Sequence, residues 1–223
     1  MGQGAAAGMN RGGQLPRRRP VQVLDPPYAG RPEPGRARPS GRARVLRFRE
    51  VEIDPDFFEA HYFYGRACLA QGKYKEAIAP LRSACKVRAE DYQAPALLGL
   101  AYTGLGRREA ASRASARAVK VAKQQLSVNP GDVRALYLGA GCLARIGQRK
   151  TALAWAARAL DLDGKDSAVL YNVGCLYAIL GRTADALKCL KKVVRSGWRK
   201  EWIKNDPDWT ALRGLKEFIA LVS

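Results

Sequence analysis

A pattern of small residues recurs four times in this chain at a nearly constant interval. In each copy a glycine stands five residues before an alanine, and a further glycine or alanine stands seven residues before that glycine. The central glycines are Gly72, Gly106, Gly147 and Gly181, separated by steps of 34, 41 and 34 residues. A period of this length is typical of stacked supersecondary units, so the chain is expected to form a repeat array.

Each copy has the pattern of two helices joined at the central glycine. In the first copy, apolar residues follow helical spacing on both sides of Gly72: Tyr64, Cys68 and Leu69 before it, and Ala77, Leu81 and Ala84 after it. Glycine suits the end of the first helix, where a left-handed backbone is needed. Small residues at Gly65 and Ala77 allow the two helices to approach closely. The unit is therefore a helical hairpin, which buries its faces only by stacking on its neighbours.

The spacing of these residues, with Tyr74, resembles the tetratricopeptide repeat, whose period is 34 residues. The resemblance covers residues 45–196 and implies an all-α fold, a right-handed superhelical solenoid of antiparallel helical hairpins with four repeats over residues 58–196. The sequence departs from the family where a large aromatic residue is usual early in the first helix, with His61, Pro95, Leu136 and Leu170 there. The proline that usually closes a repeat is present as Pro130.

The step of 41 residues indicates seven extra residues between Ala118 and Pro130. This stretch contains good helix formers and no glycine or proline. Seven residues make about two helical turns, so the second helix of the second hairpin should be longer by ~10 Å and keep the same apolar face.

The two ends of the chain differ from the repeats. Residues 1–44 hold seven of the twelve prolines, are rich in Arg and Gly, and are expected to be a disordered tail. Residues 45–57 are interpreted as the remnant of a preceding repeat and its turn. An alternative is that the chain is a fragment of a longer repeat protein with a foreign or mistranslated N-terminus.

Residues 197–223 are predicted to form a capping segment that covers the last hairpin. Asp206 before Pro207 is suited to cap a helix whose first residue is proline. The Asp206-Pro207-Asp208 turn, with Leu212 and Arg213 after it, resembles the closing segment of bacterial tetratricopeptide arrays attached to adenylate cyclases, serine/threonine kinases or winged-helix transcription regulators. The sequence contains no residues of those effector domains.

The net charge of +19 raises the question of a nucleic-acid partner. Eleven arginines lie in residues 1–49, and two basic stripes lie on predicted second helices: Arg113, Arg117 and Lys120, and Lys188, Lys191, Lys192 and Arg195. Such stripes attract phosphate backbones or acidic proteins. However, a charged helix face is more often simply solvated, and no recognition motif or zinc finger accompanies the charge.

The sequence offers little for catalysis, metals or cofactors, and none is predicted. The five cysteines are odd in number, lack Cys-x-x-Cys spacing and are expected to be buried in a reducing cytosol. The single histidine, His61, falls on a packing position, and the aspartates near Gly164 fit an inter-repeat turn better than a calcium loop. No secretory signal or membrane-spanning stretch is visible, so a cytoplasmic protein without membrane insertion is expected.

The resemblance also implies where a partner would bind, because ligands of tetratricopeptide arrays commonly lie against the first helices, on the concave surface. The exposed positions expected there are Tyr62, Arg66, Gln93, Arg134, Tyr137, Arg145, Tyr171 and Asn172. Tyrosine and arginine suit a protein-binding groove. An alternative left open is that the three tyrosines only pack between hairpins. The carboxylate clamp of chaperone-binding members is not predicted, because Arg66, Leu100, Gly141 and Cys175 stand where it would need asparagine.

The leading hypothesis is a non-enzymatic scaffold that holds a segment of a protein or peptide partner in this groove. The second is a regulatory or sensor region of a longer signalling protein, such as a cyclase, kinase or transcription regulator. The third is a basic protein that binds nucleic acid. The sequence does not define the oligomeric state.

Overall fold

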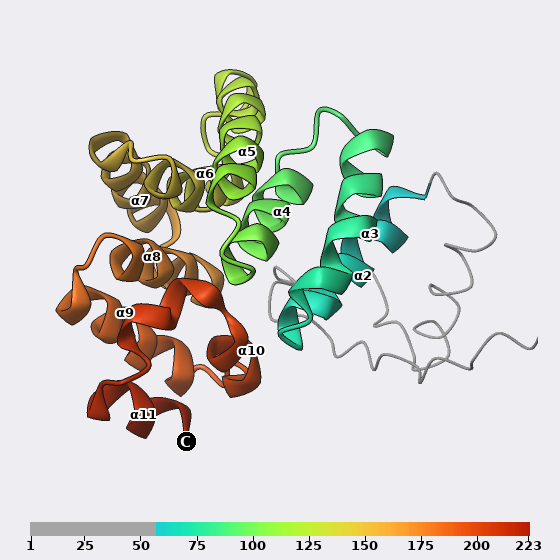
Figure 1. Ribbon diagram of the computed structural model, residues 1–223. Coiled ribbons are helices and arrows are strands. Elements are labelled where there is room, and N and C mark those ends of the chain that lie inside the picture. Colours follow the sequence, from blue (N-terminus) through green and yellow to red (C-terminus); the bar gives the residue numbers. More distant parts are fainter. Residues whose placement is uncertain (1–56) are drawn as a thin grey trace, which may run out of the picture.

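The computed structural model describes residues 57–223 (Figure 1). The predicted tail of residues 1–44, and all but the last residue of the predicted remnant over residues 45–57, lie outside this range. The described part consists of helices and connecting segments, without a β-strand. The fold is an all-α repeat solenoid, as predicted. None of the helices in this part of the chain is both long and apolar enough to cross a membrane.

Eight helices form four consecutive hairpins, each made of a first and a second helix. The pairs are α2 (Phe58–Ala70) with α3 (Tyr74–Val87), α4 (Gln93–Gly104) with α5 (Arg108–Val128), α6 (Val133–Arg145) with α7 (Arg149–Asp163), and α8 (Ser167–Ile179) with α9 (Thr183–Arg195). The hairpins follow one another around a curve, from blue-green to orange in Figure 1.

The central glycines end the first helices as the pattern predicts. Gly72 has a φ of +69°, and the other three central glycines have similar positive values. At the first hairpin the amide of Lys73 donates to the carbonyl of Cys68 over 2.9 Å, and that of Gly72 donates to the carbonyl of Leu69 over 2.9 Å. These bonds satisfy carbonyls that the end of a helix would otherwise leave without partners. A side chain at this position would be strained, which explains the recurring glycine.

The predicted extension of the second hairpin is confirmed, because α5 is a continuous helix of 21 residues. Its added turns keep an apolar face, with Val121 and Ala122 buried. Gln125 donates to Asp132 over 3.1 Å, which ties the extension to the start of α6. Asp132 in turn caps α6 by accepting from the amide of Ala135 over 2.9 Å.

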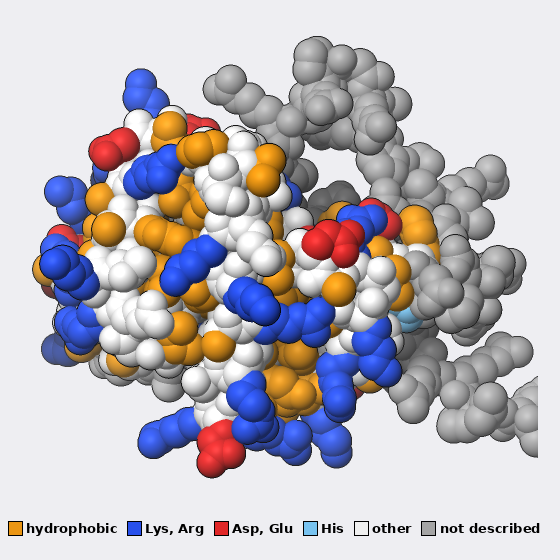
Figure 2. Space-filling view, turned by 90° about the horizontal axis from the view of Figure 1, so that it is seen from above, with side chains coloured by type: hydrophobic (Ala, Val, Ile, Leu, Met, Phe, Trp, Pro, Cys, Tyr) orange, Lys and Arg blue, Asp and Glu red, His pale blue; other side chains and the backbone are white. Residues whose placement is uncertain are grey.

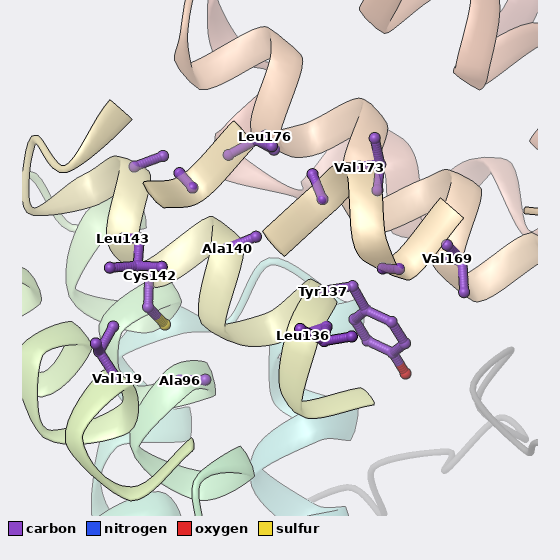
Figure 3. Close-up of a cluster of buried hydrophobic side chains, with 14 of the residues drawn as sticks. Ala96, Val119, Leu136, Tyr137, Ala140, Cys142, Leu143, Val169, Val173 and Leu176 are labelled. Atoms are coloured by element: carbon purple, nitrogen blue, oxygen red, sulfur yellow. The ribbon is translucent and has the colours of Figure 1, made fainter. Parts of the chain in front are cut away.

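Close packing of the two helices within a hairpin depends on small residues. Ala77, Ala152 and Ala186 are fully buried at the places where second helices meet first helices. The core continues between hairpins around α6, where side chains from α4, α5, α6 and α8 meet (Figure 3). All five cysteines are buried free thiols, and His61 is buried, as expected for structural residues.

The sequence predicts a helix that begins at Pro207, but the C-terminal segment is divided into several short helices. Residues 198–223, called the C-terminal strap from here on, form three short helices: α10 (Lys200–Asn205), the 3-10 helix η1 (Pro207–Leu212) and α11 (Lys216–Val222). The predicted cap is present, since the Asp206 carboxylate accepts from the amide of Asp208 over 2.9 Å. Trp209 and Phe218 pack against the last hairpin.

The strap also reaches the first hairpin, more than a hundred residues earlier in the chain. The side-chain amide of Asn205 donates to the backbone carbonyl of Ala70 over 3.0 Å, and the hydroxyl of Tyr74 donates to the backbone carbonyl of Asn205. The strap therefore joins the last hairpin to the first. The contact forms because Gly72 leaves room beside Asn205, which lies 3.2 Å from where a Cβ would be.

Candidate functional site

One pocket lies on the inner surface, where the first helices of all four hairpins meet the strap. Seven of the eight groove residues predicted from the sequence line it: Tyr62, Arg66, Gln93, Arg134, Tyr137, Arg145 and Asn172. The cavity has a volume of about 50 Å³. This is enough for a few water molecules, since each needs roughly 10–15 Å³.

The polar end of the pocket is a hydrogen-bonded group from three successive hairpins. The hydroxyl of Tyr62 (α2) donates to Oε1 of Gln93 (α4) over 3.2 Å. The same oxygen accepts from a guanidinium nitrogen of Arg134 (α6) over 3.3 Å. The guanidinium carbon of Arg66 lies 5.5 Å from the centre of the Tyr62 ring. One arginine charge and one hydroxyl thus meet at a single amide oxygen, and a second arginine lies over the Tyr62 ring.

The two arginine charges act on the tyrosine hydroxyls of the pocket. Burial raises the pKa of Tyr62, and the Arg66 and Arg134 charges partly oppose that rise. Burial also raises the pKa of Tyr137, again opposed by Arg134. Both hydroxyls are therefore neutral at physiological pH and can donate a hydrogen bond to a ligand.

The other end of the pocket is closed by a buried ion pair between the array and the strap. A guanidinium nitrogen of Arg145 (α6) contacts a carboxylate oxygen of Asp208 (η1), with side chains only 12% and 6% exposed. The neighbouring Asp206 carboxylate accepts from the hydroxyl of Tyr171 over 2.6 Å and lies 3.9 Å from the sulfur of Cys175. The structure thus uses an inner-surface arginine to hold a carboxylate.

Burial dominates the acid–base behaviour of this pair of aspartates. Burial, with the charge of Asp208 next in importance, raises the pKa of Asp206 to about 7. Burial also raises the pKa of Asp208, and the Arg145 charge opposes that rise. The two carboxyls share one enclosed space, so the ionisation of one disfavours that of the other.

These aspartates form a hydrogen-bonded network better suited to fastening the strap than to holding a metal. Ligand atoms of Cys175, Asp206 and Asp208 lie within 4.8 Å of one another. However, the Arg145 guanidinium already supplies the positive charge beside Asp208.

In the turn before the last hairpin, Asp166 caps α8 by accepting from the backbone amide of Ala168 over 2.7 Å. This agrees with the inter-repeat turn expected for that region.

The expectation that all eight groove positions are exposed is wrong. Tyr171 is 1% exposed and does not line the pocket, because it lies between two strap tryptophans. Its ring stacks on Trp198 with centres 4.8 Å apart, and it accepts from the indole of Trp209 over 3.3 Å. Tyr171 is therefore a packing residue, one of the alternatives left open by the sequence.

Tyr62, Arg66 and Tyr137 are also buried, for a different reason. Tyr62 stacks on Phe58 of the same helix, with ring centres 5.6 Å apart, and Arg66 lies over the rings of Tyr62 and Phe63. Tyr137 packs in the core around α6. Gln93, Arg134, Arg145 and Asn172 are partly buried. These side chains reach the pocket mainly with their polar ends.

Sequence reasoning missed the lining that comes from the strap, namely Trp202, Asp206 and Asp208. The Asp-Pro-Asp turn was recognised, but only as a helix start. The usable signal was charge: two aspartates close together in a strongly basic chain need cationic partners when they are buried. The apolar lining outside the predicted groove set is Ala96, Leu97, Leu100, Leu138, Gly141 and Cys175, of which Leu100, Gly141 and Cys175 stand at the positions considered for a carboxylate clamp.

The basic stripes on the second helices are partly engaged within the protein. On α5, Arg113 pairs with Glu109 over 3.6 Å, and Arg117 donates to the carbonyl of Cys85 over 2.7 Å. On α9, Lys188 and Lys192 are exposed. Figure 2 shows Lys and Arg spread over the whole visible face with few acidic residues between them. This distribution suits general attraction of anions rather than one recognition patch.

Comparisons with known proteins agree with this fold. Two family profiles, both described as tetratricopeptide repeat, match residues 38–94 and 167–196. A similar solved structure is TTC0263, a thermophilic TPR (tetratricopeptide repeat) protein in Thermus thermophilus. It is 23% identical over 76% of this chain and 89% of that chain, with a TM-score of 0.51. Two segments of the chain are therefore similar to the tetratricopeptide repeat, and the fold is that of a helical-repeat solenoid.

Two further similar structures have lower structural agreement. YrrB, described as a TPR protein with an unusual peptide-binding site, is 24% identical over 73% of this chain and 81% of that chain, with a TM-score of 0.40. MamA is 19% identical over 70% of this chain and 86% of that chain, with a TM-score of 0.41. No curated protein matches the sequence significantly.

Proposed function

We propose that this protein is a non-enzymatic interaction scaffold that binds a segment of a partner protein in the inner-surface pocket. The observation that carries the proposal is the convergence of side chains from four first helices on one site. Tyrosine and arginine contribute much of the energy of protein interfaces. A pocket with apolar walls and a few polar groups is also the usual form of a binding site.

The strap restricts how a partner segment can enter. Displacing the strap would expose Ile203, Trp209 and Leu212, which are buried. Each such side chain contributes roughly 1.5–3 kcal/mol through burial, so displacing the strap would take several kcal/mol from the binding free energy of a peptide. The partner segment therefore binds with the strap in place, against α2, α4 and α6, and the strap forms one wall of its site.

Gly141 offers a way to block the pocket without disturbing the core. It lines the pocket within α6, and among residues 57–223 a Cβ built there would contact only Arg145, at 3.7 Å. Leucine at this position should fill the cavity, whereas alanine adds one methyl group and favours the helix. Tyr137 is a poorer choice for this test, because its removal would leave a hole in the core.

The test is a pull-down from a lysate of the source cells, with the full chain as bait and mass spectrometry as readout. We expect Gly141→Leu to lose the partner that the unchanged chain recovers, and Gly141→Ala to retain it. Circular dichroism would show that both variants are folded. Lys188→Glu with Lys192→Glu, on the outer surface of α9, serves as a charge control and should retain the partner. Equal recovery with Gly141→Leu would refute binding in the pocket.

A further inference from the structure

We infer that the partner segment is acidic, and that one of its Asp or Glu carboxylates binds to Arg134, Arg66 and Tyr62. This inference rests on the proposed function, because it names the chemistry of the segment that occupies the pocket. It assigns Gln93 a role as well, as the residue whose amide oxygen occupies the acceptor position in the free protein.

The first argument is the charge of the pocket lining. Among the described residues, the array contributes three arginines to the lining, Arg66, Arg134 and Arg145, and no Asp or Glu. The nearest array carboxylate on this side is Asp91, which accepts from the side chain of Gln93 over 3.3 Å. Both carboxylates in the lining, Asp206 and Asp208, come from the strap. The array side of the pocket is therefore complementary to an acidic segment, and the strap already supplies such a segment at one end.

The second argument is that the protein itself shows this pairing. Asp208 of the strap binds Arg145, and the adjacent Asp206 accepts from Tyr171. An arginine and a tyrosine from successive first helices thus hold neighbouring carboxylates. Arg134 and Tyr62 are the same pair of residue types at the polar end of the pocket. An arginine–carboxylate contact is about twice as strong as a neutral hydrogen bond.

The third argument is the geometry at Gln93. Its Oε1 atom accepts from both Tyr62 and Arg134 at 3.2 and 3.3 Å, the long end of the range for such bonds. Burial raises the pKa of the Tyr62 hydroxyl, the Arg66 and Arg134 charges lower it, and the Asp91 charge behind Gln93 raises it further. A carboxylate would bring negative charge to this group of donors, which a neutral amide cannot do.

The fourth argument is the charge of the molecule around the site. Residues 57–223 contain 28 Lys and Arg but 14 Asp and Glu, and basic side chains outnumber acidic ones on the face shown in Figure 2. Such a field raises the association rate of an acidic segment and disfavours a basic one. The field alone does not direct the segment to the pocket, so the test must separate the two effects.

Gln93→Glu separates them, because it puts a carboxylate where the ligand is inferred to bind. The change is nearly isosteric and preserves the acceptor for Tyr62 and Arg134. It also removes the side-chain NH2 group that donates to the buried Asp91 over 3.3 Å, so urea unfolding of this variant accompanies the binding assay. Gln124→Glu is the matched control, since it makes the same charge change at an exposed position of α5. Arg134→Gln is the second variant, which removes the positive charge instead.

The probes are three fluorescein-labelled peptides with the repeated sequences Ser-Glu-Gly, Ser-Gln-Gly and Ser-Lys-Gly, titrated with the full chain at 150 mM salt. We expect the Glu peptide to bind best. We expect its affinity to fall by about tenfold or more in Gln93→Glu and Arg134→Gln, and by less than about twofold in Gln124→Glu. Equal losses in Gln93→Glu and Gln124→Glu, or no preference for the Glu peptide, would overturn the inference.

The pull-down partner distinguishes this inference from the proposed function. If Gly141→Leu abolishes recovery of the partner while Gln93→Glu does not, the pocket binds a segment that is not acidic, and only the present inference is wrong. If Gly141→Leu leaves recovery unchanged, the proposed function is wrong as well.

Discussion

A methyl group added at Gly65 should destabilise the array, and the same methyl group should stabilise it once Leu81 is shortened. A Cβ at Gly65 would lie 2.5 Å from Cγ and 2.7 Å from Cδ2 of Leu81. Leu81 is 0% exposed, so it has no open space into which it can move. The third hairpin shows the compatible pairing, because Ala140 and Ala156 stand at the two corresponding positions and are buried together.

The magnitudes follow from two opposing terms. Overpacking of this kind costs about 1–3 kcal/mol, and replacing glycine by alanine in a helix gains about 1 kcal/mol. With so short a contact, Gly65→Ala should lower the free energy of unfolding by about 1–2 kcal/mol. Leu81→Ala alone should cost about 2–5 kcal/mol through the cavity it leaves. In that background the overpacking disappears, and Gly65→Ala should raise the free energy of unfolding by about 1 kcal/mol.

The assay is urea unfolding of the four chains of this double-mutant cycle, followed by circular dichroism. The coupling free energy between the two positions should be about 2–3 kcal/mol, within the range for residues in contact. If Gly65→Ala had the same effect with and without Leu81, close packing at the seam would not explain why these positions hold small residues.

Two further predictions concern the contacts that fasten the strap. Arg145→Met should lower the free energy of unfolding by about 3–5 kcal/mol, because it leaves Asp208 buried without its cation; adding Asp208→Leu should restore most of this loss, and thermal melts of both chains check it. Burial raises the pKa of Asp206 from 3.8 to about 7, so the folded chain retains a proton that the unfolded chain releases. Stability should therefore decrease as the pH rises from about 4 through 7, and Asp206→Asn should flatten this part of the urea-unfolding profile.

The hairpins could be predicted from the sequence because each depends on signals close together in the chain. Gly72 ends one helix, Ala77 begins the packing face of the next, and both recur at a fixed interval. The length of α5 followed from the same logic, since seven residues without a helix breaker add whole turns. Local rules are sufficient where every contact is made between neighbouring hairpins.

The route of the strap could not be predicted in this way. Asn205 resembles any polar residue at the end of a short helix. Nothing in the sequence near Tyr74 indicates a partner 131 residues later in the chain. The burial of Tyr171 could not be predicted for the same reason, because its neighbours Trp198 and Trp209 both lie in the strap. The repeat register predicts that Arg145 lies on the inner surface, but the path of the strap is needed to identify Asp208 as its carboxylate partner.

The contact between Tyr74 and Asn205 also sets an order of events during synthesis on the ribosome. The two residues are 131 positions apart, and at about 5–20 residues per second the interval between them is roughly 7–26 s. The first hairpins can stack on one another during this time, since each needs only its neighbour. The pocket lacks its Asp206 and Asp208 wall until the strap emerges. A nascent chain thus presents all three pocket arginines to acidic polypeptides before Arg145 receives its own carboxylate.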